Sequence, residues 1–235
     1  MQPTIVLVHG AFAESASWSG VIAALTATGH RAVAAANPLR GLAADAAAVS
    51  DLVRAIDGPV VLVGHSYGGA VITEVEADNV VSLVYVAAFA PEPGESCFEL
   101  SARYPGSTLG EALEPVARGD GTTDLTIAQE RFHTQFCADV PAGDAALMAA
   151  TQRPVTREAL LEPAGERALW TRLPSWFVVP EGDRNIPAEV QRYMAGRAGA
   201  RRTLELDGAS HAVAVSRPRA VTELILEAAT AGVEV

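Results

Sequence analysis

The first ninety residues alternate short β-rich apolar runs with stretches of helical character, and this alternation constrains the fold more than any other feature. Parallel strands need long crossover connections, usually helices, which cover both faces of the sheet. We expect strands at residues 4–8, 31–36, 60–63 and 80–87, with helices between them. The pattern therefore predicts an α/β fold with a mostly parallel sheet.

The alternation stops between about residues 91 and 173, where Pro- and Gly-rich turns are mixed with helical segments expected at 125–137 and 145–152. No strand alternation is evident there. Strands resume at 175–179 and 203–206, followed by helices at 187–197 and 218–229 respectively. We predict a single domain, residues 1–235, whose sheet has about six strands and whose residues 91–173 form a small helical cap insertion.

Composition excludes several classes of partner and chemistry. The chain has 235 residues, enough to bury roughly 70% of its extended surface in one domain. Its formal net charge of -11 disfavours nucleic acid and anionic membrane surfaces, which need basic patches. All 17 basic residues are arginines, so a Schiff base, a Ser-Lys dyad or a phosphate-loop lysine cannot form.

The N-terminal sequence, the length of the apolar runs and the spacing of the cysteines predict where the protein is located and whether it binds a metal. No signal peptide precedes the first strand and no apolar run reaches 18 residues, so we expect a cytoplasmic protein without a membrane span. Cys97 and Cys137 lack metal-ligand spacing and are expected to be free thiols. We expect neither a metal nor an organic cofactor.

The motif richest in chemical meaning is Gly64-His65-Ser66-Tyr67-Gly68, which directly follows an apolar strand and directly precedes a helix. A G-x-S-x-G match alone is weak. In this context it predicts a tight strand-to-helix turn that strains the serine backbone, needs glycine on both flanks and lifts the hydroxyl above the sheet edge. Ser66 is therefore the candidate nucleophile.

A serine nucleophile needs a histidine base, and five histidines compete for this role. We interpret His9 and His65 as structural, His30 as a surface residue and His133 as a residue of the insertion that could face a pocket. His211 follows the last expected strand, at the strand edge where such sheets bind ligands, and is our choice.

The acid that orients the base is expected in the turn after the strand at 175–179. Asp183 is our choice, Glu181 is the main alternative, and Asp207 is interpreted as a turn former. The order Ser66, Asp183, His211 is the order of this architecture. For the oxyanion we expect the backbone amides of Tyr67 and of Ala11, which we favour over Phe12.

Substrate size depends on the insertion, where the sequence is least informative. Aromatic side chains could line an apolar pocket over Ser66 or could be core of the insertion. This candidate substrate-binding set comprises Phe12, Phe98, Tyr104, Phe132, Phe136 and Trp170.

At these motifs the sequence resembles the α/β-hydrolase superfamily, in the small branch that holds plant methylesterases, such as the salicylate-binding esterase, and the hydroxynitrile lyases. The matching segments are 6–11 with Ser17-Trp18, 64–69, 87–89, 183–187 with Gln191-Arg192, and 208–211. The resemblance implies the triad Ser66, Asp183 and His211, oxyanion amides at Ala11 and Tyr67, and a helical cap.

Departures from the family disfavour some of its chemistries. The lyases place a lysine just after the catalytic histidine and a threonine at the position of Gly10, whereas Ala212 follows His211 here. Dehalogenases and epoxide hydrolases use aspartate in place of Ser66. We therefore hypothesise a serine hydrolase of small apolar carboxylic esters, with lactones or thioesters as further substrates and an acyl-enzyme intermediate.

Two alternatives stay open. One is a small-molecule receptor that keeps the fold and the triad. The other is a non-hydrolytic member of the fold, such as a lyase, acyltransferase or perhydrolase. The expected partner is a small molecule, and the sequence leaves a homodimer open.

Overall fold

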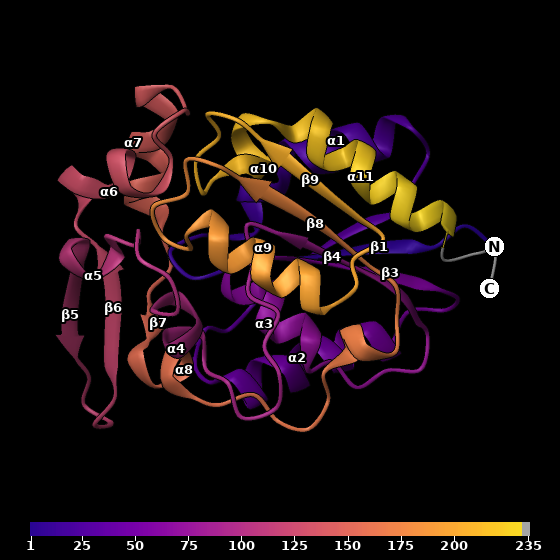
Figure 1. Ribbon diagram of the computed structural model, residues 1–235, viewed down its shortest axis with the longest axis horizontal. Coiled ribbons are helices and arrows are strands. Elements are labelled where there is room, and N and C mark those ends of the chain that lie inside the picture. Colours follow the sequence, from indigo (N-terminus) through magenta and orange to yellow (C-terminus); the bar gives the residue numbers. More distant parts are fainter. Residues whose placement is uncertain (232–235) are drawn as a thin grey trace.

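A six-stranded sheet, parallel throughout, forms the centre of the computed structural model, which describes residues 1–231 (Figure 1). The strand order is β2-β1-β3-β4-β8-β9. The strands are β1 (Thr4–Val8), β2 (Ala32–Ala35), β3 (Val60–His65), β4 (Val80–Val86), β8 (Ser175–Pro180) and β9 (Arg202–Leu206). The predicted α/β-hydrolase fold class is confirmed.

Helices cover both faces of this sheet (Figure 1). One face carries α1 (Ser19–Ala27), which follows the 3-10 turn η1 (Ser15–Trp18), together with α10 (Val213–Ser216) and α11 (Pro218–Ala231). The other carries α2 (Leu42–Arg54), α3 (Tyr67–Thr73) and α9 (Ala188–Arg197).

The central strand β3 shows why both layers are needed. Its side chains alternate between the faces: Val61 and Val63 belong to the core under α1 and α11, whereas Val60 and Leu62 belong to the core under α2 and α3. All four are fully buried. A strand buried on both sides has the continuous apolar sequence typical of parallel sheets.

The segment between β4 and β8, called the insertion below, departs from the prediction. It contains α4 (Cys97–Ser101), α5 (Leu109–Ala112), β5 (Leu113–Ala117), β6 (Thr123–Ile127), α6 (Gln129–Phe136), α7 (Ala142–Thr151), β7 (Val155–Thr156), α8 (Arg157–Leu161) and the 3-10 turn η2 (Leu169–Thr171). The three strands form a separate antiparallel sheet in the order β5-β6-β7.

The expectation of a purely helical insertion with a helix over 125–137 is therefore wrong at its N-terminal end. Leu125 and Ile127 are buried and alternate with the partly exposed Asp124 and Thr126, which is the period of a strand. The helix α6 begins only at Gln129. Helix α7, by contrast, matches the expected helix at 145–152 within a few residues.

The insertion lies over the sheet edge at which the parallel strands end (Figure 1). Backbone hydrogen bonds join it to the core: the Phe12 N–H donates to the Arg153 carbonyl over 3.1 Å, and the Ala212 N–H donates to the Phe136 carbonyl over 3.0 Å. The insertion is thus fixed next to both the loop after β1 and the loop that contains His211.

Both cysteines are buried free thiols, as expected. Within residues 1–231, no helix is both long enough and apolar enough to cross a membrane.

Candidate active site

Ser66 lies between β3 and α3 in a strained backbone conformation. Its φ of 55° and ψ of -125° are unusual for a residue with a side chain. A Cβ on Gly64 would lie 2.5 Å from the Gly68 carbonyl oxygen, and one on Gly68 would lie 2.4 Å from the Val8 carbonyl oxygen. Only glycine fits these two flanking positions, so the sequence motif and the observed turn have the same steric cause.

His211 and Asp183 form the buried pair of the site. The Nδ1 atom of His211 lies 2.7 Å from Oδ2 of Asp183, and both side chains are almost fully buried. The carboxylate also accepts hydrogen bonds from the N–H groups of Asn185 and Ile186 and from Nε2 of Gln191. An ionised carboxylate can only accept, so Nδ1 carries the ring proton and Nε2 is left as a base.

Ser66 and His211 line the same cavity. Among the described residues, however, the Ser66 hydroxyl makes no hydrogen bond to the His211 ring. Catalytic hydrogen bonds are often long in unliganded enzymes and tighten when substrate binds. The structure therefore places Ser66 and His211 on the same cavity, and it places Asp183 against the His211 ring.

Glu181, the alternative acid, lies outside this arrangement. Its carboxylate pairs with Arg192 at the surface. The geometry favours Asp183 as the partner of the histidine.

Two further histidines, His65 and His9, hold the loops around the site through hydrogen bonds. His65 Nε2 lies 3.0 Å from the His211 carbonyl oxygen, and the two rings are 4.7 Å apart. Burial lowers the pKa of His65 well below its usual value, so the ring is neutral and donates from Nε2 to that carbonyl. His9, whose pKa burial also lowers, accepts from the Asn37 N–H through Nε2 and so holds the loop after β1.

Backbone amides suited to an oxyanion come from two loops. The N–H of Tyr67 stands in the first turn of α3, where amides have no acceptor within the helix. In the loop after β1 the Phe12 N–H is already bonded to the Arg153 carbonyl. This leaves the Ala11 N–H as the available donor, in line with the expectation from sequence.

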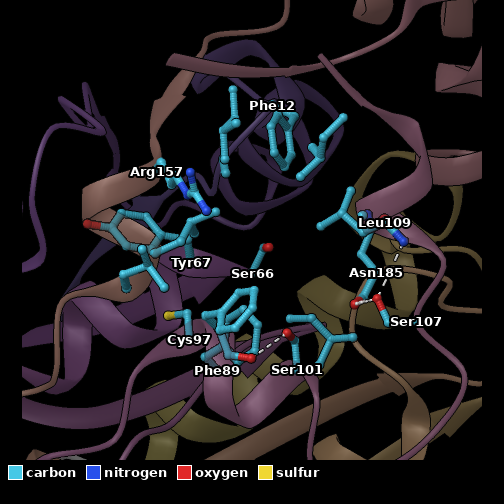
Figure 2. Close-up of a pocket in the computed structure, with 18 of the residues that line it drawn as sticks. Phe12, Ser66, Tyr67, Phe89, Cys97, Ser101, Ser107, Leu109, Arg157 and Asn185 are labelled. Carbon is cyan, nitrogen blue, oxygen red and sulfur yellow. Dashed lines mark hydrogen bonds between the residues drawn. The ribbon is translucent and has the colours of Figure 1, made fainter. Parts of the chain in front are cut away.

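A cavity of about 560 Å³ opens in front of Ser66 (Figure 2). Its wall is mainly apolar, with a few hydroxyl and amide groups. The insertion supplies most of the lining, from α4, α5, β5, β6, α8 and a loop between them, and the core supplies the rest. The lining residues are Ala11, Phe12, Ser66, Tyr67, Phe89, Cys97, Phe98, Ser101, Ser107, Leu109, Gly110, Leu113, Pro115, Leu125, Arg157, Leu160, Leu161, Asn185, Ile186 and His211.

Of the expected aromatic pocket, only Phe12 and Phe98 line this cavity. The expectation for the other aromatics is corrected, because they pack elsewhere. Phe132 and Phe136 are stacked core residues, and Phe136 lies edge-on to the His211 ring at 4.9 Å between centroids.

The remaining two aromatics are held away from the cavity by other partners. Trp170 is buried and donates its ring N–H to the Pro91 carbonyl. Tyr104 lies against Tyr193.

The residues that sequence reasoning missed are mostly aliphatic or polar. Arg157, Leu160 and Leu161 all line the cavity from α8, and their spacing of three and four residues places them on one face of that helix. This spacing was the available signal. Within residues 1–231, no group of three or more His, Cys, Asp or Glu side chains is arranged to hold a metal ion.

The fold and the site define a family. The chain belongs to the alpha/beta hydrolase family, whose family model matches residues 5–224. Among its relatives, Esterase PIR7B of Oryza sativa subsp. japonica is 29% identical over 257 residues, covering 95% of this chain and 94% of its own. Salicylic acid-binding protein 2 of Nicotiana tabacum is 26% identical over 251 residues, covering 95% and 96%.

Solved structures agree on the fold. The crystal structure of polyneuridine aldehyde esterase superposes with a TM-score of 0.81 at 20% identity, covering 97% of this chain and 99% of that one. The resemblance to the α/β-hydrolase superfamily, and to the branch with the salicylate-binding esterase, is thereby confirmed.

Proposed function

We propose that this protein hydrolyses carboxylic esters of small molecules through an acyl-enzyme on Ser66. The observation that carries the proposal is the strained Ser66 at the floor of the same cavity that His211 lines, with His211 held by the buried Asp183. The esterase named above, similar along almost the whole chain, supports the reaction class.

In the first half-reaction, the Ser66 oxygen attacks the acyl carbon while Nε2 of His211 takes the hydroxyl proton. Asp183 holds the ring in the required tautomer and stabilises the imidazolium. His211 then gives the proton to the leaving alcohol, and the C–O bond of the ester breaks. In the second half-reaction, water attacks the acyl-enzyme with His211 as its base and releases the acid.

The amides of Ala11 and Tyr67 are proposed to bind the oxyanion of each tetrahedral intermediate. Each such donor is worth roughly 3 to 4 kcal/mol in the transition state. The insertion is proposed to act as the cap that shapes the substrate cavity. Its volume of about 560 Å³ suits a small molecule.

The test is turnover of p-nitrophenyl acetate together with labelling by a fluorophosphonate. The wild type is expected to hydrolyse the ester and to be labelled at Ser66. Ser66→Ala should lose both by a factor of at least about 10³. Ser101→Ala, which removes another hydroxyl from the cavity wall, serves as the control for labelling at Ser66. Full activity in Ser66→Ala would remove the proposal.

A receptor role is the second candidate. It is supported by the name of the tobacco relative, salicylic acid-binding protein 2. Pre-steady-state kinetics separate the two functions. A stoichiometric burst without further turnover would favour a receptor, whereas steady turnover favours the hydrolase.

A further inference from the structure

Among residues 1–231, a single permanently charged side chain, Arg157, lines the cavity in front of Ser66. Neither Asp nor Glu belongs to its lining, although the chain has 28 acidic residues and only 17 basic ones. The remaining lining is apolar or uncharged, apart from the ring of His211.

No carboxylate within residues 1–231 pairs with Arg157. Some other arginines are paired: Arg197 pairs with Glu95 at 2.5 Å, and Arg192 contacts three glutamates. Arg157 is solvent-exposed at the cavity wall, so its guanidinium is available to a ligand. Guanidinium groups bind carboxylates with two parallel hydrogen bonds, and such pairs are stronger than neutral hydrogen bonds.

The backbone that carries Arg157 is fixed. The preceding residue, Thr156, is 2% exposed, and its N–H donates to the Leu39 carbonyl while its hydroxyl donates to the Arg40 carbonyl. The Thr156 side chain also accepts from the Ala159 N–H and so caps α8. Leu160 and Leu161 then line the same cavity from the next turn.

The position of Arg157 relative to Ser66 defines an end of the cavity. Figure 2 shows Ser66 near the middle, Arg157 on the side of Tyr67, and Asn185 with Ser107 on the opposite side. A group bound by Arg157 would therefore lie on the Tyr67 side of Ser66.

We infer that Arg157 selects esters that carry a second, free carboxylate several bonds from the scissile carbonyl, such as monoesters of dicarboxylic acids. This inference rests on the proposed function. Water cleaves the single ester bond to give an alcohol and a carboxylic acid, and the second carboxylate is unchanged. The net charge of -11 repels anions from the molecule as a whole, so a preference for them must arise from a local cation.

The experiment compares two matched series of substrates: the monomethyl esters of succinic, glutaric and adipic acid, and the same esters with the free carboxylate replaced by a primary amide. Methanol release is measured for each. In the wild type, kcat/KM is expected to be about tenfold higher for the best acid than for its amide, which corresponds to about 1.4 kcal/mol. In Arg157→Gln this ratio should fall to about one.

Two further variants control the measurement. Arg157→Lys keeps the charge but loses the two-point geometry, so it should recover part of the ratio. Arg172→Gln removes an exposed arginine outside the cavity, which has no carboxylate partner within residues 1–231, and should leave the ratio unchanged. Thermal unfolding checks that each variant is folded. A ratio in Arg157→Gln equal to that of the wild type would overturn the inference.

The outcomes also separate this inference from the function on which it rests. Turnover of the amide series by the wild type and its loss in Ser66→Ala would keep the hydrolase proposal, whatever the ratio. An Arg157-independent ratio, or a preference for the amides, would then overturn the inference alone. Absence of turnover in both series, with p-nitrophenyl acetate still cleaved, would overturn the inference and keep the hydrolase proposal. Absence of p-nitrophenyl acetate turnover as well would overturn both.

Discussion

At the scale of single residues, the site depends on how closely the loop after β1 approaches Ser66. A Cβ built on Gly10 would lie 2.6 Å from the Cβ of Ser66 and 3.2 Å from its hydroxyl oxygen. Any side chain at position 10 must therefore displace Ser66 or the loop that carries Ala11. The threonine found at this position in hydroxynitrile lyases is incompatible with the present geometry, which agrees with a hydrolytic reaction.

This contact leads to a prediction for Gly10→Ala. A displacement of Ser66 by a fraction of an ångström should lower kcat for p-nitrophenyl acetate by about 10- to 100-fold, because reacting atoms must be closely aligned. Gly143→Ala in α7, where an added Cβ meets nothing within 4 Å, is the control. A kcat for Gly10→Ala equal to that of the wild type would show that the loop after β1 accommodates the added methyl group without displacing Ser66.

The residues of the proposed site could be found from sequence because each is tied to a local signal. Ser66 lies between glycines that the turn requires, and Asp183 and His211 each follow a strand. The aromatic lining had no such signal. The sequence left Phe132 and Phe136 open between pocket lining and core of the insertion. Packing within the insertion and against His211 decides which way the helix face points, and this depends on residues distant in the chain.

At the scale of elements, a buried carboxylate joins α2 to α3. Asp45 is fully buried and accepts hydrogen bonds from the Tyr67 hydroxyl at 2.8 Å and from the Arg40 N–H at 3.1 Å. Burial raises its pKa above the usual value of 3.8. Because Tyr67 also supplies a proposed oxyanion amide, this contact fixes the element on which that amide lies.

The raised pKa of Asp45 predicts a pH dependence of stability. The folded state binds this proton more tightly than the unfolded state, so the contribution is present below pH 3.8 and is lost as pH rises through the raised value. Asn at this position does not titrate. The free energy of unfolding of Asp45→Asn, relative to wild type, should therefore increase with pH over that window.

Urea unfolding at several pH values between 4 and 7 measures this difference. Asp51→Asn, which changes an exposed aspartate on the same helix, is the matched control. Removal of the partner, Tyr67→Phe, leaves the buried carboxylate with one donor fewer and should cost about 1 to 3 kcal/mol at pH 7. If the free energy of unfolding of Asp45→Asn, relative to wild type, falls as pH rises, Asp45 is not a buried carboxyl with a raised pKa.

Elements also show where sequence reasoning loses power. The central strands of the parallel sheet are continuous apolar runs such as 60–63, which are recognisable from sequence without their neighbours. Strand β6 has only two buried side chains, Leu125 and Ile127. Its partners β5 and β7 are short, with Pro115 in the middle of β5 and Pro154 directly before β7. This sheet forms because it packs against the core and α8. A local sequence pattern does not show such contacts.

At the scale of the whole molecule, a carboxylate of the insertion binds the core in addition to the backbone hydrogen bonds between the two parts. The helix α2 has no side-chain cap of its own at Gly41, and Glu162, from the end of α8, accepts from the Leu42 N–H at 2.6 Å instead. A carboxylate at this end of a helix also interacts favourably with its dipole. The core helix therefore depends on the insertion for the start of its first turn.

This mutual dependence predicts that the insertion and the core unfold together. Urea unfolding followed by hydrogen exchange should show peptides from β6 and from β3 losing protection at the same urea concentration. Glu162→Gln should lower both midpoints in parallel, by about 0.5 to 2 kcal/mol in the free energy of unfolding, because a helix cap is weakened. Glu166→Gln, a neighbouring glutamate that does not cap α2, should leave both midpoints unchanged. Loss of protection in β6 well before β3 would instead mean that the cavity wall carrying Arg157 can open while the sheet that carries Ser66 stays folded.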